Sequence, residues 1–97
     1  MTVDRFKEAC VVRKAVWKFT FSVTDEIVID MQAGAEIVHV GVQHDVPCVW
    51  ALVDPAAPAV RRTFALFGTG HPVPGGLVHR GSFQTPPFVW HLFEAES

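Results

Sequence analysis

A chain of 97 residues, 49% hydrophobic and 19% charged, has enough apolar side chains for one folded domain and too few charges to stay disordered. The net charge of −2 argues against a general nucleic-acid surface, and no apolar run reaches the roughly 20 residues of a membrane helix. The first residues, MTVDRFKEAC, lack the apolar segment of a secretory signal. We therefore expect a cytoplasmic protein with neither a membrane nor a nucleic acid as partner.

Charge is distributed unevenly along the chain. Residues 1–18 hold five cations and two acids, a net charge of +3. The remaining residues hold three arginines and eight acids, a net charge of −5. We interpret this pattern as a solvated basic segment beside an acidic body.

The first predicted element has no strand pattern. We expect residues 1–11 to be an N-terminal arm or a short helix, and residues 12–97 to form a single all-β domain. From residue 13 polar and apolar residues alternate, and the runs are rich in β-branched and aromatic side chains, which is typical of strands. RKAVWKFTF (13–21) is the first such strand, with its aromatic side chains facing inward.

Six further strand patterns follow at short intervals. TDEIVIDM (24–31) is followed by the turn QAGA, and EIVHVGVQ (36–43) by the turn His44-Asp45. Simple alternation in 36–43 places Val38, Val40 and Val42 on one face. The other predicted strands are 48–54, 61–67, 77–84 and 88–94. About seven short antiparallel strands predict a compact β-sandwich or barrel.

Three of the predicted strands, 48–53, 63–67 and 88–93, are nearly apolar on both faces. In an antiparallel sandwich the outer face of each sheet is normally wet and polar. Because no amphipathic helix is available to cover the second face, we expect another copy of the chain to cover it in a homo-oligomer. The alternative is a closed barrel with scattered hydrophobic residues on its surface.

Residues capable of chemistry do not form a known catalytic or metal-binding motif. The five histidines show no HxH, HExxH or HxxxH spacing, and there is neither a GxSxG motif nor a tyrosine. Cys10 and Cys48 lack CxxC spacing, so both are expected to be reduced and buried. His91, between Trp90 and Leu92, is expected to be the most buried histidine. We expect no catalytic residue, metal or cofactor, and an enzyme is the less favoured interpretation.

The segment FGTGHPVPGG (67–76) holds four glycines and two prolines between two apolar runs. Glycines permit positive φ and let backbone N–H groups approach a ligand closely. Arg61 and Arg62 precede this loop and Arg80 follows it, so a hairpin of the flanking strands would bring the arginines together. Guanidinium groups near glycine amides and aromatic rings suit a nucleotide. The alternative is a long connection stiffened by prolines.

The string VPCVWALVDPAAPAVRRTFALFGTGHPVP (46–74), followed by GSFQ (81–84) and a final aromatic strand, resembles a family of small uncharacterised proteins from phages and prophages. Members look like VPC-[LV]-WALVDP, then R-TF, then GTGHP-[IV]-P and G-[ST]-FQ. KFTFSVTDEIVIDM (18–31) is similar to their opening hairpin. The chain departs from them at His44-Asp45, where relatives look more like Asn-Gly, and in an N-terminal extension of roughly a dozen residues. The resemblance implies a phage setting and a compact all-β fold, and it supplies no catalytic residue.

These observations predict a homo-oligomeric binding protein that sequesters an anionic nucleotide immune signal in the cytoplasm of the host cell. Its role would be to counter host defence, because small oligomeric phage proteins with pockets recur as inhibitors of such defences. The expected ligand-binding residues are Arg61, Arg62 and Arg80 for phosphates, Trp50 to stack a base, and Gly68, Thr69, Gly70 and His71 for backbone and polar contacts.

Two other functions stay open on the sequence alone. The first is a structural or protein-interaction module, such as a virion accessory or an inhibitor of a host protein, whose working surface is its apolar outer faces. The second is a nucleotide hydrolase with His71 or His79 as its base. That hydrolase would need a carboxylate or a second histidine close to the base in space.

Overall fold

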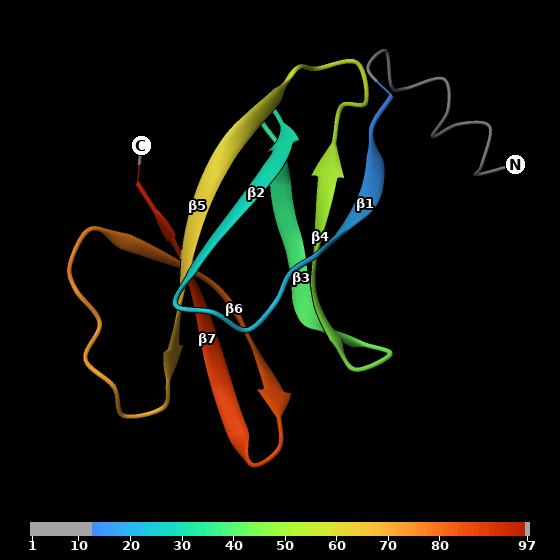
Figure 1. Cartoon of the computed structure of the whole chain (residues 1–97). Coiled ribbons are helices and arrows are strands. Elements are labelled where there is room, and N and C mark those ends of the chain that lie inside the picture. Colours follow the sequence, from blue (N-terminus) through green and yellow to red (C-terminus); the bar gives the residue numbers. More distant parts are fainter. Residues whose placement is uncertain (1–12, 97) are drawn as a thin grey trace, which may run out of the picture.

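The computed structural model describes residues 13–96, which form seven strands in two antiparallel sheets (Figure 1). The strands are β1 (Ala15–Thr20), β2 (Glu26–Gln32), β3 (Glu36–Gln43), β4 (Val46–Val53), β5 (Ala59–Gly68), β6 (Leu77–Thr85) and β7 (Phe88–Ala95). The predicted all-β architecture is confirmed, and each predicted strand ends within two residues of the observed one. The expected N-terminal arm, residues 1–11, lies outside the described residues, as does Cys10.

The strands form two layers with the orders β1-β4-β3 and β2-β5-β7-β6 (Figure 1). The chain passes between the layers from β1 to β2, from β2 to β3 and from β4 to β5. Strands β3 and β6, one from each layer, lie side by side. The sandwich is therefore closed along this side, whereas β1 and β2 each have a hydrogen-bonded strand on one side only within residues 13–96.

Strand β7 lies between β5 and β6, so these two strands do not form a hairpin. The hairpin predicted around the glycine-rich loop is therefore wrong. The apolar sequence of β7 accounts for the difference, because a central position lets this strand pair on both sides and removes Leu92 completely from solvent. The loop of residues 69–76 instead joins two strands that flank a third.

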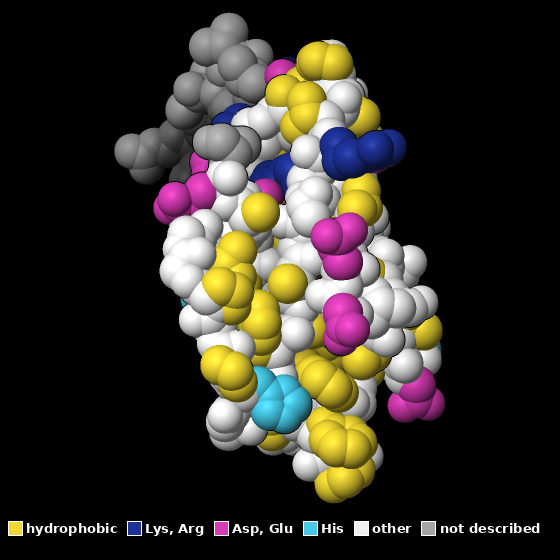
Figure 2. All heavy atoms as spheres, turned by 60° about the vertical axis from the view of Figure 1, so that its left-hand side comes forward, with side chains coloured by type: hydrophobic (Ala, Val, Ile, Leu, Met, Phe, Trp, Pro, Cys, Tyr) yellow, Lys and Arg dark blue, Asp and Glu magenta, His cyan; other side chains and the backbone are white. Residues whose placement is uncertain are grey.

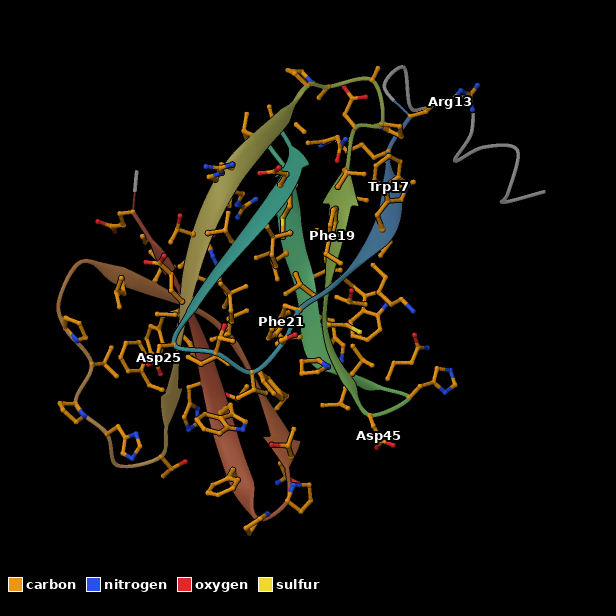
Figure 3. All side chains as sticks on the ribbon, in the orientation of Figure 1. Arg13, Trp17, Phe19, Phe21, Asp25 and Asp45 are labelled. Atoms are coloured by element: carbon orange, nitrogen blue, oxygen red, sulfur yellow. The ribbon has the colours of Figure 1, made fainter. Side chains whose placement is uncertain are left out.

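The core lies between the two layers and follows from the alternation of the strands. In β2 the residues Ile27, Ile29 and Met31 are buried, and the residues between them are exposed. Their main partners are Val40, Val49, Ala51, Val53, Phe64, Leu66, Phe83 and Leu92. Phe19 and Phe21 pack against this core, as predicted, and point between the layers in Figure 3.

Bulges in β3 and β6 change the alternation that the sequence alone suggests. In β3 the register shifts between Ile37 and His39, so that Ile37 lies opposite Ala51 and Val40 opposite Val49, both core positions. An extra residue reverses which face the following side chains occupy. Val38 is therefore exposed, and the prediction that it shares a face with Val40 is wrong.

The second bulge, between His79 and Gly81 of β6, faces β3 at the closed side of the sandwich. A Cβ atom at Gly81 would lie 2.7 Å from Cβ of Val40, which is closer than two carbon atoms that are not bonded to each other can approach. Glycine is thus required here by the contact between the two layers.

The turn of the β3–β4 hairpin has an unusual backbone conformation, since His44 and Asp45 both have positive φ, of 51° and 64°. These angles are typical of a type I′ turn, and they confirm the predicted turn.

Substitution of Gly81 tests the closed side of the sandwich. We expect Gly81→Ala to lower the free energy of unfolding by about 1–3 kcal/mol, because the added methyl group must push β6 away from Val40. Urea denaturation measures the change. Gly75→Ala is the matched control, since no atom lies within 4 Å of its added Cβ. Equal stabilities of the two variants would contradict the close contact of β3 and β6.

Candidate functional site

Two arginines and one glutamate form a charged cluster on the inner face of the four-stranded sheet. Glu94 of β7 is 7% exposed and accepts hydrogen bonds from both sides. Arg62 of β5 donates from Nε to Oε2 at 2.6 Å and from Nη2 to Oε1 at 2.7 Å. Arg80 of β6 donates from Nε to Oε1 at 2.8 Å. We call these three residues the Arg–Glu–Arg cluster.

The strand order explains why these side chains meet. Glu94 lies directly opposite Phe64 of β5 and Val78 of β6. Arg62 is two residues from Phe64, so it shares the inner face of the sheet with Glu94. Arg80 occupies the bulge of β6, which turns its side chain towards the same carboxylate. Nη1 of Arg62 donates to the carbonyl of Ala35 at 2.6 Å, which fixes the guanidinium further.

The cluster holds Glu94 in its ionised form. Burial alone would raise the pKa of Glu94, but the hydrogen bonds from Arg62 and Arg80, together with their charges, outweigh burial and lower the pKa below its ordinary 4.5. Two guanidinium groups around one carboxylate leave one positive charge in excess. The cluster itself therefore carries one net positive charge inside an acidic chain.

A cavity of about 790 Å³ opens beside the cluster. Its volume lies within the range of small-molecule sites in proteins. Arg61 also borders it and makes a 3.8 Å contact with Asp30, both side chains being exposed. The remaining lining is Gly34, Val60, Thr63, Val78, Ala95 and Glu96, beside the cluster itself. Figure 2 shows basic and acidic side chains together at the upper end of this side of the molecule, above a band of hydrophobic side chains.

The structure brings together only part of the predicted ligand site. Arg61, Arg62 and Arg80 line one cavity, although the hairpin that was expected to bring them together does not form. Gly68 follows Arg62 by six residues along β5, so the start of the glycine-rich loop lies about 20 Å from the cluster. Trp50 lies in the other sheet, where it alternates with buried core residues and packs its ring on His39 at 5.2 Å between centroids. Neither the loop start nor Trp50 reaches the arginine cavity.

The first residues of the glycine-rich loop are held by contacts within the chain. The N–H group of His71 donates to the carbonyl of Gly68 at 3.1 Å, and the ring of His71 packs over Gly68. The hydroxyl of Thr69 lies 2.9 Å from Nε2 of His91. Gly70 has a positive φ of 89°, which turns the chain after this anchored segment. These contacts fasten the loop to the end of the sheet.

Sequence reasoning missed a row of histidines and hydroxyl groups on the outer face of the same sheet. Ser82 lies opposite His91 on the neighbouring strand, and its Oγ is 2.8 Å from Nδ1 of that ring. Nε2 of His79 is 3.3 Å from the same hydroxyl, and the two histidine rings are 6.5 Å apart. His91, the one histidine of the five that is not exposed, thus has both ring nitrogens occupied, by Ser82 and by Thr69. Only the strand order, which places β6 beside β7, reveals this row.

The outer face is partly covered by the chain itself. Pro74 and Leu77, from the loop and the start of β6, border an apolar pocket of about 410 Å³ with Ala65 and Phe67 of β5. The rings of Phe67 and Phe93 also pack edge to face at 5.6 Å between centroids. The outer residues in the middle of β5 and β7 are half-buried in a single chain: Thr63, Ala65, Phe67, Val89, His91 and Phe93. The expected homo-oligomer stays a prediction.

The fold and the cavity together define a small all-β domain with a cavity, lined by three arginines and two glutamates, at one end of its larger sheet. The chain belongs to the family described as "Domain of unknown function (DUF7352)", whose family model matches residues 12–97. Searches of curated proteins and of solved structures return no match. Within residues 13–96 no group of three or more side chains is arranged to hold a metal ion, and no helix is long and apolar enough to cross a membrane.

Removal of the Glu94 charge tests the cluster as a structural unit. We expect Glu94→Gln to lower the free energy of unfolding by about 1.5–3 kcal/mol, because it removes the charge that receives the hydrogen bonds of two partly exposed arginines. Urea denaturation at neutral pH measures this loss. Glu96→Gln makes the same change on an exposed carboxylate two residues away, and we expect an effect below about 0.5 kcal/mol. Similar losses in both variants would contradict the role of Glu94.

The lowered pKa of Glu94 also predicts a pH dependence. Because the folded state holds this proton less tightly than the unfolded state, the stability from Glu94 is present above the ordinary value of 4.5. It is lost as the pH falls below that value towards the folded pKa. Unfolding curves at a series of acidic pH values should therefore show a steeper loss in the wild type than in Glu94→Gln. Parallel losses would show that the folded and unfolded pKa values of Glu94 are equal.

Proposed function

We propose that this chain is a non-enzymatic binding domain and that the cavity beside the Arg–Glu–Arg cluster receives a small anionic ligand. The guanidinium group of Arg80 at the cavity supports this proposal. Glu94 satisfies Nε of Arg80, while the two Nη groups of Arg80 donate no hydrogen bond within residues 13–96. Guanidinium forks of this kind bind phosphate and carboxylate groups.

The lining favours a ligand with a polar and an apolar part. Arg61, Arg62 and Arg80 provide the charge, whereas Val60 and Val78 provide apolar walls. A nucleotide has this division, with phosphates at one end and a base or ribose at the other. The resemblance to phage and prophage proteins supports a setting in the host cytoplasm, where a homo-oligomer of this chain sequesters a nucleotide immune signal. In this proposal the residues 68–71 and Trp50 take no part in the site.

Native mass spectrometry with a panel of cyclic and ADP-ribose nucleotides tests this function. We expect a discrete, stoichiometric and unaltered mass to be added by one member of the panel. Calorimetric titration of that nucleotide should then show an affinity at least about tenfold lower for Arg80→Ala, because a hydrogen bond to a charged group contributes about 1.5–3 kcal/mol.

Arg13→Ala is the control for this titration, since Arg13 is an exposed arginine at the opposite sheet (Figure 3). It should bind as tightly as the wild type. Equal affinities of Arg80→Ala and the wild type would exclude the cavity as the site. If no nucleotide adds mass, the proposed function fails and a protein-interaction module becomes the better interpretation.

A second candidate function, hydrolysis of a nucleotide, is favoured by one specific observation. His79, which the sequence suggested as a base, has a second histidine close by. Ser82 lies between the ring of His79 and that of His91. Nδ1 of His79 takes no hydrogen bond within residues 13–96, so this nitrogen could act as the base, while Ser82 and His91 hold the ring in place. His71 packs against Gly68 and is the weaker choice for the base.

Incubation with the same nucleotide panel separates hydrolysis from sequestration. A hydrolase should convert one nucleotide to products of altered mass, and His79→Gln should lower the rate at least about 100-fold, within the range of general acid–base contributions. His44→Gln, at the exposed turn of the β3–β4 hairpin, should leave the rate unchanged. Recovery of every nucleotide unaltered would exclude this candidate.

A further inference from the structure

The open side of the sandwich presents two strand edges without a neighbour in residues 13–96. Strand β1 is hydrogen-bonded only to β4, and β2 only to β5. Neither strand contains a proline, and their pairings show no register shift. Edges of this kind offer unpaired N–H and C=O groups to another strand unless a protein blocks them. Neither a proline nor a bulge blocks these two edges, and the charges that they carry repel a like edge but attract an opposite one.

The outer faces of these two strands carry matching patterns. Val16 and Lys18 lie opposite Leu52 and Trp50, on the side of the sheet that faces away from the core. In β2 the exposed residues alternate with buried ones. The outer positions are Val16 and Lys18 along the first edge, with Lys14 just before the strand, and Glu26, Val28 and Asp30 along the second. Each edge therefore reads charge, valine, charge, with opposite signs.

We propose that β1 of one copy pairs with β2 of a second copy. All strand pairings in the described domain are antiparallel, and an antiparallel register with Val16 opposite the partner's Val28 aligns the charges. Lys14 then faces the partner's Asp30, and Lys18 faces the partner's Glu26. Cross-strand pairs of opposite charge stabilise a sheet and like charges destabilise it. The charges thus favour pairing of a β1 edge with a β2 edge, and they disfavour pairing of two β1 or two β2 edges.

Exposed apolar side chains support the same junction. Val16 is 56% exposed and Val28 is 50% exposed, so pairing of the edges would cover both. Trp17, on the core side of β1, is 38% exposed and would come beside inner residues of the partner's β2. Pairing of the two edges would break few of the contacts that their side chains make in a single copy. Lys18 donates to the exposed Gln43 at 2.8 Å, and Asp30 makes only its 3.8 Å contact with Arg61.

Two-fold symmetry would close the assembly. Each copy contributes one β1 edge and one β2 edge, so a rotation of 180° can form two equal junctions at once. Sheet β1-β4-β3 of each copy then continues into sheet β2-β5-β7-β6 of the other. This dimer leaves none of the four edges open. The inference rests on the homo-oligomer in the proposed function and assigns its interface to the strand edges.

Charge reversal on each edge, followed by mixing, tests this dimer. One variant carries Lys14→Glu and Lys18→Glu, and the other carries Glu26→Lys and Asp30→Lys. Native mass spectrometry and sedimentation should show a wild-type dimer and two monomeric variants, because each variant alone opposes like charges. An equimolar mixture should form a heterodimer, since both of its junctions again join opposite charges. High salt should weaken the wild-type dimer.

Controls separate the interface from folding and from the ligand. Glu36→Lys alters an exposed charge on β3, away from both edges, and should stay dimeric. Circular dichroism establishes that each variant is folded, and the milder single variants Lys18→Glu and Glu26→Lys repeat the mixing test if a double variant is not. The change in nucleotide affinity caused by Arg80→Ala is measured separately in the monomeric variant with Lys14→Glu and Lys18→Glu, which keeps the contact of Asp30 with Arg61, so that ligand binding and assembly are scored independently.

Each other outcome overturns the inference in a different way. Folded charge variants that remain dimeric would show that the interface lies elsewhere, while the homo-oligomer itself would stand. A mixture that stays monomeric would refute the pairing of β1 with β2. Growth beyond the dimer would refute the two-fold closure. A monomeric wild type would overturn both this interface and the homo-oligomer, but would leave ligand binding untouched.

Discussion

A carboxylate on the inner face of a central strand organises one end of this domain. Glu94 lies where burial alone would be costly, and the arginines of the two neighbouring strands make the position tolerable. The three strands β5, β7 and β6 are thereby tied together by side chains as well as by their backbones. Arg62 extends the link to Ala35, which lies just before β3 of the other sheet. Glu94 and its two arginines thus connect β5, β6 and β7 with the residue just before β3.

The same arrangement decides how much charge this end of the sheet can offer to a ligand. Arg62 is committed to Glu94 and Ala35 through all three of its nitrogens. Arg80 is committed through one nitrogen and is more exposed, so it is the arginine best placed to serve both the fold and a bound anion. An anion that draws Arg80 away from Glu94 would loosen the sheet end. Binding and local stability are therefore linked at this residue.

Most of the fold follows from the local pattern of the sequence. The burial of Ile27, Ile29 and Met31 could be predicted from alternation, and the turn after β3 from its residues. Strand order could not, because the pairing of β7 with both β5 and β6 depends on contacts between residues far apart in the chain. The bulge at Val38 also escaped prediction, since nothing in EIVHVGVQ marks the extra residue. The same holds for the candidate site. The three arginines could be singled out from the sequence, whereas the contacts of Glu94, Ser82 and His91 depend on the strand order.

The topology also gives the glycine-rich loop a mechanical task. Gly68 lies opposite Trp90 and Leu77 opposite Ala95, so the loop must cross the width of β7 and climb five residues along it. That path is roughly 20 Å, against a full reach of about 30 Å for the nine peptide steps between its ends. Loss of three residues would leave the segment taut, whereas added residues would find room at the surface. Because the loop is only slightly longer than the path that it spans, it limits how far β5 and β6 can move apart on either side of β7.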